Sequence, residues 1–164
     1  MKLACSLLSC ICLIAIQGPA FSATTISSSV GISATVTASC SISNVSDLEF
    51  GDDLSIGDLP RDVITTFNVT CTKTTPYSIG LDKGVTPGAS TTDRKLGGGE
   101  STLSYALYRD ATRLTNWGDD SNSWMTNLAG TGAEVTHFIY GRIPDQTWPA
   151  PDVYSDIVKI TVEY

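Results

Sequence analysis

Positive charge, histidine and helical periodicity are all scarce in this sequence. Its 164 residues include 17 acidic but only 10 basic side chains, and the net charge of -7 argues against nucleic acid or an anionic membrane as a partner. The sequence has a single histidine, His137, and no Cys-x-x-Cys pair, so it offers few ligands for a metal site and few groups for acid–base catalysis. We therefore expect no enzymatic activity, no metal and no cofactor. No apolar stripe at helical spacing is long enough to predict a helix.

The amino-terminal region has the pattern of a secretory signal peptide. Lys2 precedes an apolar run over residues 3–16, which is followed by Gly18-Pro19 and by an A-x-S site at residues 20–22. We predict residues 1–22 as the signal peptide, with cleavage after Ser22 or Ala23. The apolar run is shorter than the roughly 20 residues that a bilayer-spanning helix needs, so we expect no membrane span in the mature chain.

Strict alternation from Thr25 to Cys40 is the clearest pattern in the chain. Every even position from Ile26 is apolar or small, and every odd position is Ser, Thr or Gly. This pattern predicts an extended strand with one buried face. Ordinary strands have about 5 to 6 residues, so this one is unusually long. Either it crosses two sheets, or its first half serves another molecule.

Two cysteines, Cys40 and Cys71, lie beyond the predicted signal peptide. An even pair in an exported chain is most simply explained by one disulfide. Both lie on the apolar face of an alternating segment, as a buried bridge requires. A catalytic or metal-binding thiol is the alternative.

The rest of the chain predicts short strands separated by polar turns. The expected strands are 47–51, 63–71, 77–81, 103–108, 113–117, 135–141 and 154–164, with loops over 52–62, 84–99 and 119–132. About six or seven such strands predict an all-β sandwich of the Greek-key, immunoglobulin-like type. We interpret the three tryptophans, Trp117, Trp124 and Trp148, as packing residues rather than as one surface patch.

The two ends of the predicted sandwich complement one another. The last strand is amphipathic and leaves an open sheet edge, while the amino-terminal strand is in excess. The amino-terminal strand of one molecule could fill the vacant place in the next, and such head-to-tail contacts form filaments. Alternatively, the same strand folds back into its own domain, and the pattern alone does not separate the two arrangements.

Several motifs, in their order along the chain, resemble the spore coat protein U domain family, which includes the major subunits of Csu-type, archaic chaperone-usher pili. The motifs follow the strand that ends in Ser39-Cys40 and are Leu48–Gly51, Asn68–Thr72 with Pro76-Tyr77, Leu103–Tyr108, Trp117–Asp119, Gly141–Pro144 and Tyr154–Asp156. The resemblance implies an incomplete immunoglobulin-like domain that lacks its last strand.

The resemblance also assigns roles to regions and residues. It implies an amino-terminal donor strand over residues 23–38, an incomplete immunoglobulin-like pilin domain over residues 39–164, and the family's disulfide between Cys40 and Cys71. The donor side chains lie on the alternating face, and the acceptor groove is bordered by the terminal strand. The donor residues are Ile26, Val30, Ile32, Ala34 and Val36, and the acceptor residues are Val158, Ile160 and Val162. Ser28 is a small group at a donor position, and Gly31 weakens the strand there.

The implied function is that of an exported structural subunit of an adhesive pilus. Its partners would be other pilus subunits, a periplasmic chaperone and an outer-membrane usher, and its fibres would lie at the cell surface and support attachment and biofilm formation. Two alternatives remain. A spore or cell-envelope coat protein would have the same fold, and chaperone and usher genes adjacent to the gene would decide for the pilus. A monomeric exported binding module requires the amino-terminal strand to fold back into its own domain.

Overall fold

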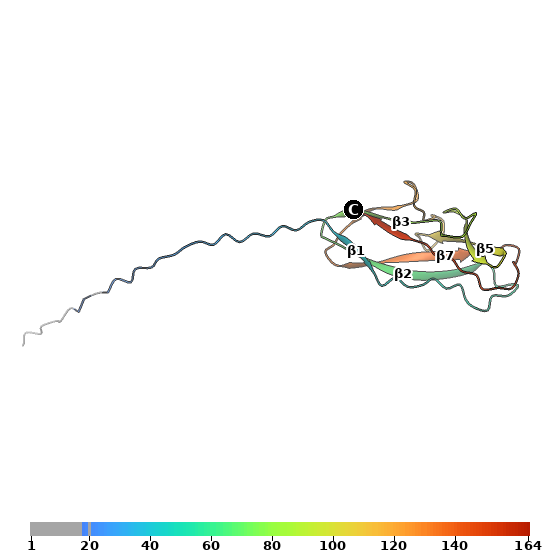
Figure 1. The fold of residues 1–164 in the computed structure, drawn as a ribbon, viewed down its shortest axis with the longest axis horizontal. Coiled ribbons are helices and arrows are strands. Elements are labelled where there is room, and N and C mark those ends of the chain that lie inside the picture. Colours follow the sequence, from blue (N-terminus) through green and yellow to red (C-terminus); the bar gives the residue numbers. More distant parts are fainter. Residues whose placement is uncertain (1–17, 20) are drawn as a thin grey trace, which may run out of the picture. The chain divides into compact units, whose positions relative to one another are not determined.

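The computed structural model describes residues 18, 19 and 21–164 and divides the chain into two units, Met1–Thr35 and Val36–Tyr164. Most of the predicted signal peptide lies outside the described residues. The described part of the first unit has no regular secondary structure. The second unit is built from strands alone, and there is no helix among the described residues (Figure 1). None of these residues therefore forms a helix long and apolar enough to cross a bilayer.

Two antiparallel sheets make up the second unit. The larger has the order β1-β2-β7-β5-β4 and the smaller the order β6-β3-β8. The strands of the larger sheet are β1 (Cys40–Ser43), β2 (Arg61–Cys71), β7 (Glu134–Ile143), β5 (Ser101–Tyr108) and β4 (Arg94–Gly98). Those of the smaller are β6 (Met125–Ala129), β3 (Pro76–Leu81) and β8 (Ile160–Glu163). This all-β, two-sheet architecture confirms the predicted fold class.

The core is formed by the inward side chains of the two sheets. In β2 the burial alternates from Thr65 to Cys71, as a strand with one face on the core requires. The fully buried apolar side chains are Phe67 and Val69 from β2, Ile79 and Leu81 from β3, Ile143 from β7, and Trp117 from the segment after β5. Burial of this continuous apolar cluster stabilises the contact between the sheets.

A buried arginine joins β4 to the second sheet. The Arg94 side chain is fully buried, and its guanidinium donates hydrogen bonds of 2.7–2.9 Å to four backbone carbonyls, those of Leu81, Asp82, Thr91 and Trp117. Desolvation lowers the pKa of this guanidinium, while the carboxylates around it act in the opposite direction. The Trp117 indole donates to the Ile79 carbonyl at 2.9 Å. Backbone acceptors, rather than a paired carboxylate, therefore satisfy this buried cation.

Five of the predicted strands are confirmed as β2, β3, β5, β7 and a shorter β8. Four predictions for the other segments are wrong. Residues 47–51 form no strand, because Leu48 and Phe50 pack over Gly141 as irregular chain. Residues 113–117 make one isolated bridge, Tyr108 to Asn116. The predicted loops 84–99 and 119–132 contain β4 and β6.

The predicted strand from Thr25 to Cys40 is also absent as a paired strand. Regular pairing starts only at Cys40, where β1 joins β2. Among the described residues, the long alternating pattern therefore does not correspond to a paired strand.

Candidate functional site

The alternating segment presents its apolar side chains to solvent. The exposed fractions are 95% for Ile26, 82% for Val30, 93% for Ile32 and 84% for Val36, and Ala34 is exposed as well. Large β-branched side chains are normally buried, and a contiguous exposed set marks an interaction site. Between residues 21 and 38 the described chain makes no strand pairing, so its backbone donors and acceptors are free to pair elsewhere.

Three edge strands of the sandwich, β1, β6 and β8, have one unpaired side. Within the described residues β1 pairs with β2 alone, and β8 pairs with β3 alone. The edge at β4 differs, because Ser155 forms a bridge with Gly97 through two hydrogen bonds of 2.8 and 3.0 Å. β6 pairs with β3 alone as well, but a register shift and the positive φ of Asn127 make it irregular. A regular open edge offers a row of donors and acceptors to an added strand, so β1 and β8 are where a strand can be added.

The inward face is incompletely covered at these two edges. Ile42 lies opposite the fully buried Val69 and on the same face of β1 as Cys40, yet it is 38% exposed. On the other sheet, the predicted acceptor residues pack against the core but remain only half-buried, namely Val158, Ile160 and Val162. Their neighbours on β3, Ile79 and Leu81, are fully buried. Apolar surface is thus left open along both free edges.

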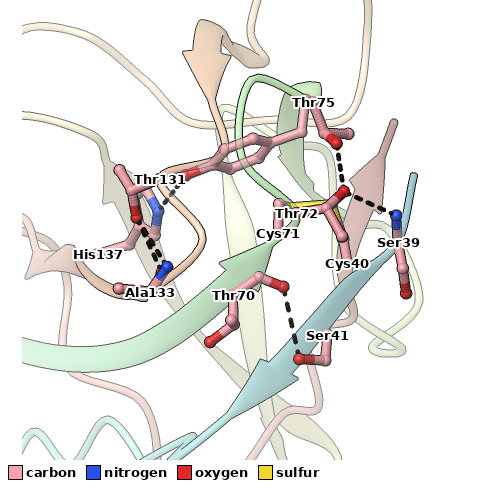
Figure 2. Close-up of a disulfide and its surroundings, with 11 residues drawn as sticks. Ser39, Cys40, Ser41, Thr70, Cys71, Thr72, Thr75, Thr131, Ala133 and His137 are labelled. Carbon is pink, nitrogen blue, oxygen red and sulfur yellow. Dashed lines mark hydrogen bonds between the residues drawn. A yellow bond between two sulfur atoms is a disulfide. The ribbon is translucent and has the colours of Figure 1, made fainter. Parts of the chain in front are cut away.

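The start of β1 is anchored firmly to β2. Cys40 and Cys71 form the disulfide, with an S–S distance of 2.01 Å and a Cα–Cα distance of 4.1 Å (Figure 2). The Thr72 amide donates to the Ser39 carbonyl at 2.9 Å, and the Ser39 amide donates to the Thr72 hydroxyl at 3.2 Å. The amino-terminal segment therefore emerges from a covalently fixed point of the sandwich.

The approach to β8 is held by carboxylates. The Asp82 carboxylate accepts the Lys159 amide at 2.9 Å, while the Asp82 amide donates to the Lys159 carbonyl at 3.1 Å. Asp156 accepts the Tyr105 hydroxyl at 2.7 Å and the Val85 amide at 2.9 Å. Burial, and then this hydrogen bond to Asp156, raise the pKa of Tyr105, which stays a neutral donor. These contacts fix the register in which β8 joins β3.

The single histidine has a packing role. His137 is buried, stacks on Phe67 with ring centroids 5.5 Å apart, and its Nε2 lies 3.2 Å from the Tyr77 hydroxyl. Desolvation lowers the pKa of His137. No three His, Cys, Asp or Glu side chains converge as metal ligands in the part of the chain that the structure describes. The Asp119-Asp120 and Asp52-Asp53 pairs therefore form no such cluster there.

Sequence reasoning missed two residues that define the free edges. Ile42 continues the even-numbered apolar series beyond Cys40, so extending the alternation by one step would have found it. Asp82 gave no signal, because its contact with Lys159 joins residues 77 positions apart. The three tryptophans do not form one surface patch, since Trp117 is fully buried and Trp124 lies against Gly80.

The chain is an all-β sandwich of two antiparallel sheets, with an immunoglobulin-like architecture. The family model of the Spore Coat Protein U domain matches residues 26–161, and the chain belongs to this family. It is 34% identical over 103 residues to Protein U of Myxococcus xanthus, covering 59% of this chain and 57% of that one. This chain thus spans little more than half the length of that relative.

A solved structure has a similar fold. It is the crystal structure of the CsuC–CsuE chaperone–tip adhesion subunit pre-assembly complex, from the archaic chaperone-usher Csu pili of Acinetobacter baumannii. The match has a TM-score of 0.58 and 20% identity, and covers 79% of this chain and 41% of the matched chain. At this identity the likeness shows the fold.

Proposed function

We propose that the chain is an exported structural subunit of a chaperone-usher pilus, which polymerises by donor-strand complementation. The observation that carries the proposal is the exposure of four large apolar side chains on one alternating face, in a chain whose sandwich has free edges at β1 and β8. The segment has the pattern of a strand but no partner among the described residues of its own chain. A second copy of the domain supplies the missing partner.

In the proposed contact, the donor segment of one subunit pairs with the free edge of β8 in the next. Its even-numbered side chains, among them Ile26, Val30, Ile32, Ala34 and Val36, cover the half-buried Val158, Ile160 and Val162 of the acceptor and pack towards Ile42 of β1. Residues 23–38 are then the donor strand and residues 39–164 the acceptor domain. Burying Ile26, Val30, Ile32 and Val36 contributes at most about 6–12 kcal/mol, which is large enough to offset much of the cost of ordering the segment.

The route to the fibre follows from the exposed apolar surface. Before assembly the open edges require protection, which a periplasmic chaperone provides, and an outer-membrane usher then exports the subunits to the cell surface. Fold similarity to a subunit from a chaperone pre-assembly complex supports the chaperone as a partner. Surface attachment and biofilm formation are the proposed use of the fibre, and the chain itself carries out no catalysis in this proposal.

Hydrogen–deuterium exchange tests the proposal residue by residue. In the chaperone-bound subunit, the amides of residues 24–37 are expected to exchange at the rate of an unstructured chain. In the assembled fibre, these amides become protected, because they form new strand pairing, whereas the edge of β8 is covered in both states. Unchanged exchange in residues 24–37 upon assembly would contradict donor-strand pairing. The amides of β2, which are paired in both states, provide the internal reference.

A coat role on spores or the cell envelope is the second candidate, and membership of the Spore Coat Protein U family favours it. It uses the same fold and permits the same strand exchange. Deleting a chaperone gene adjacent to the gene for this chain separates the two candidates. A pilus subunit disappears from the periplasm without its chaperone, whereas a coat protein that needs no chaperone accumulates normally.

A further inference from the structure

A groove of about 920 Å³ lies near the Arg61–Ile143 end of the β2–β7 pair, at a site that the proposed strand exchange does not use. Two irregular segments, 48–56 and 148–156, supply most of its walls. Its apolar lining includes Phe50, Leu54, Ile56, Trp148 and Val153, of which Ile56 and Val153 are largely exposed. Groove walls that expose apolar side chains of this size mark a docking surface.

The charge of the groove is mainly negative, although Arg61 borders it and donates to the Phe50 carbonyl at 3.0 Å. Its lining contains the carboxylates of Glu49, Asp52, Asp152 and Asp156, and no Lys, Arg or His among the described residues that line it. Asp156 is engaged in hydrogen bonds, but the other three extend an acidic rim around the apolar floor. The groove therefore favours an occupant that presents apolar side chains flanked by positive charge.

The outer face of the five-stranded sheet presents such a surface. Phe138 and Tyr140 lie on β7 with their ring centroids 6.3 Å apart, and Ile64 of β2 lies opposite Tyr140. Phe138 and Ile64 are about half exposed. The outer face of a sandwich is ordinarily polar, so an aromatic and aliphatic cluster at its centre is unusual.

Two guanidinium groups are fixed beside this cluster. The Arg113 guanidinium lies 5.7 Å from the centroid of the Tyr140 ring, and Arg142 donates two 2.7 Å hydrogen bonds to Asp62. Arg113 is 3.3 Å from the same carboxylate. The Arg113 side chain is only 10% exposed and the Arg142 side chain 35%, so Arg142 is the cation that this face presents, on a chain whose overall charge is -7.

We propose that the acidic groove docks the outer sheet face of a second copy of this chain. The exposed apolar side chains Ile56 and Val153 cover Phe138 and Ile64 of the second copy, and the acidic rim lies against Arg142 of that copy. The contact joins different surfaces of the two copies and is therefore heterologous. It uses neither residues 24–37 nor the edge of β8, so it does not depend on strand exchange and binds fibres or subunits side to side.

Cysteine cross-linking in the periplasm tests this contact. Two full-length chains, one carrying Val153→Cys and the other Phe138→Cys, are co-expressed with their signal peptides and analysed on a non-reducing gel after boiling. Boiling removes non-covalent assemblies, so only a disulfide between the copies leaves a dimer, and a reductant must abolish it. The control pair combines Val153→Cys with Lys73→Cys, which lies on an exposed turn away from both surfaces.

The proposed contact predicts several-fold more dimer from the test pair than from the control pair. Arg142→Glu in the Phe138→Cys chain is expected to lower the dimer yield several-fold, and Asp152→Arg in the Val153→Cys chain is expected to restore it. Equal yields from the test and control pairs would overturn the proposal. If either variant fails to accumulate, Ile64→Cys and Ile56→Cys probe the same two surfaces, and the same comparison decides.

The experiment separates the two proposals made for this chain. A reductant-sensitive, boiling-resistant dimer reports the side-to-side contact alone. A ladder that disappears on boiling reports strand exchange, whatever the yield of the covalent dimer. Either proposal can therefore fail while the other is supported.

Discussion

A single charge on the donor face is expected to stop polymerisation without unfolding the subunit. Ile32 is 93% exposed before assembly, so replacing it with aspartate removes no packing from the unassembled chain. In the proposed fibre, the same position is buried against the acceptor. Losing the isoleucine costs about 1.5–3 kcal/mol, a roughly 10- to 150-fold weaker contact, and burying a carboxylate without a partner costs several kcal/mol more.

The assay compares fibre yield with subunit yield. Ile32→Asp, and separately Val36→Asp, is produced with the chaperone and usher, and the periplasmic subunit and the surface fibres are quantified. We expect normal chaperone-bound subunit and almost no fibre. Ser33→Asp is the matched control, because it adds the same charge to the opposite face of the alternation. Wild-type fibre yield from Ile32→Asp, or an equal loss from Ser33→Asp, would refute the assignment of the even-numbered face.

Three further predictions concern the stability of the domain. Replacing both Cys40 and Cys71 with serine opens a loop of 31 residues and is expected to lower the free energy of unfolding by roughly 3–4 kcal/mol, measured by urea denaturation; unchanged stability would contradict the role given to the disulfide. Arg94→Met leaves four buried carbonyls without their donor, so it is expected to reduce soluble subunit strongly, whereas Lys95→Met beside it changes little; equal effects would argue against the Arg94 network. His137 has its pKa lowered by burial, so the folded state binds its proton less readily than the unfolded state, and stability falls as the pH drops below the ordinary histidine value of 6.5 towards 5. His137→Gln is expected to flatten that part of the stability profile, and an unchanged slope would show that another group causes it.

The sequence predicted the strands that alternate cleanly and missed those whose side chains obey other constraints. β4 begins with Arg94 and ends in Gly97 and Gly98, a composition typical of a loop. The arginine is buried because backbone carbonyls surround it, which no local pattern reveals. The glycine at 98 is needed because the Tyr154 ring packs so closely that an added Cβ would lie 2.7 Å from it. Contacts between residues distant in sequence therefore determine that this segment forms a strand.

β6 was missed for a similar reason. Asn127 adopts a positive φ of 61°, and the pairing with β3 shifts register between Tyr77 and Ile79. An irregular strand of this kind interrupts period-two alternation, and asparagine tolerates the left-handed conformation. The error is the reverse at residues 113–117. The pattern predicts a strand there, but the Asp110 carboxylate accepts the Thr115 amide at 2.7 Å and holds a turn.

The candidate donor segment stays a prediction, and its sequence signal differs from what the structure shows for its own chain. The alternation from Ile26 to Val36 indicated a strand, and the structure leaves that segment unpaired and exposed. In the proposed function, the pattern encodes the conformation that the segment adopts in a neighbouring subunit. The sequence could not predict that Ile42 is only half-buried, because its exposure depends on which residues, distant in sequence, pack beside β1.

The most direct test of strand exchange is an SDS gel of surface-sheared material from cells that produce this chain with its chaperone and usher. Unboiled and boiled samples are compared under reducing conditions, so that no engineered or accidental disulfide contributes. The account predicts a ladder at multiples of the mature mass that collapses to a monomer on boiling, since paired strands separate slowly in detergent. A single monomer band in both lanes would contradict donor-strand polymerisation.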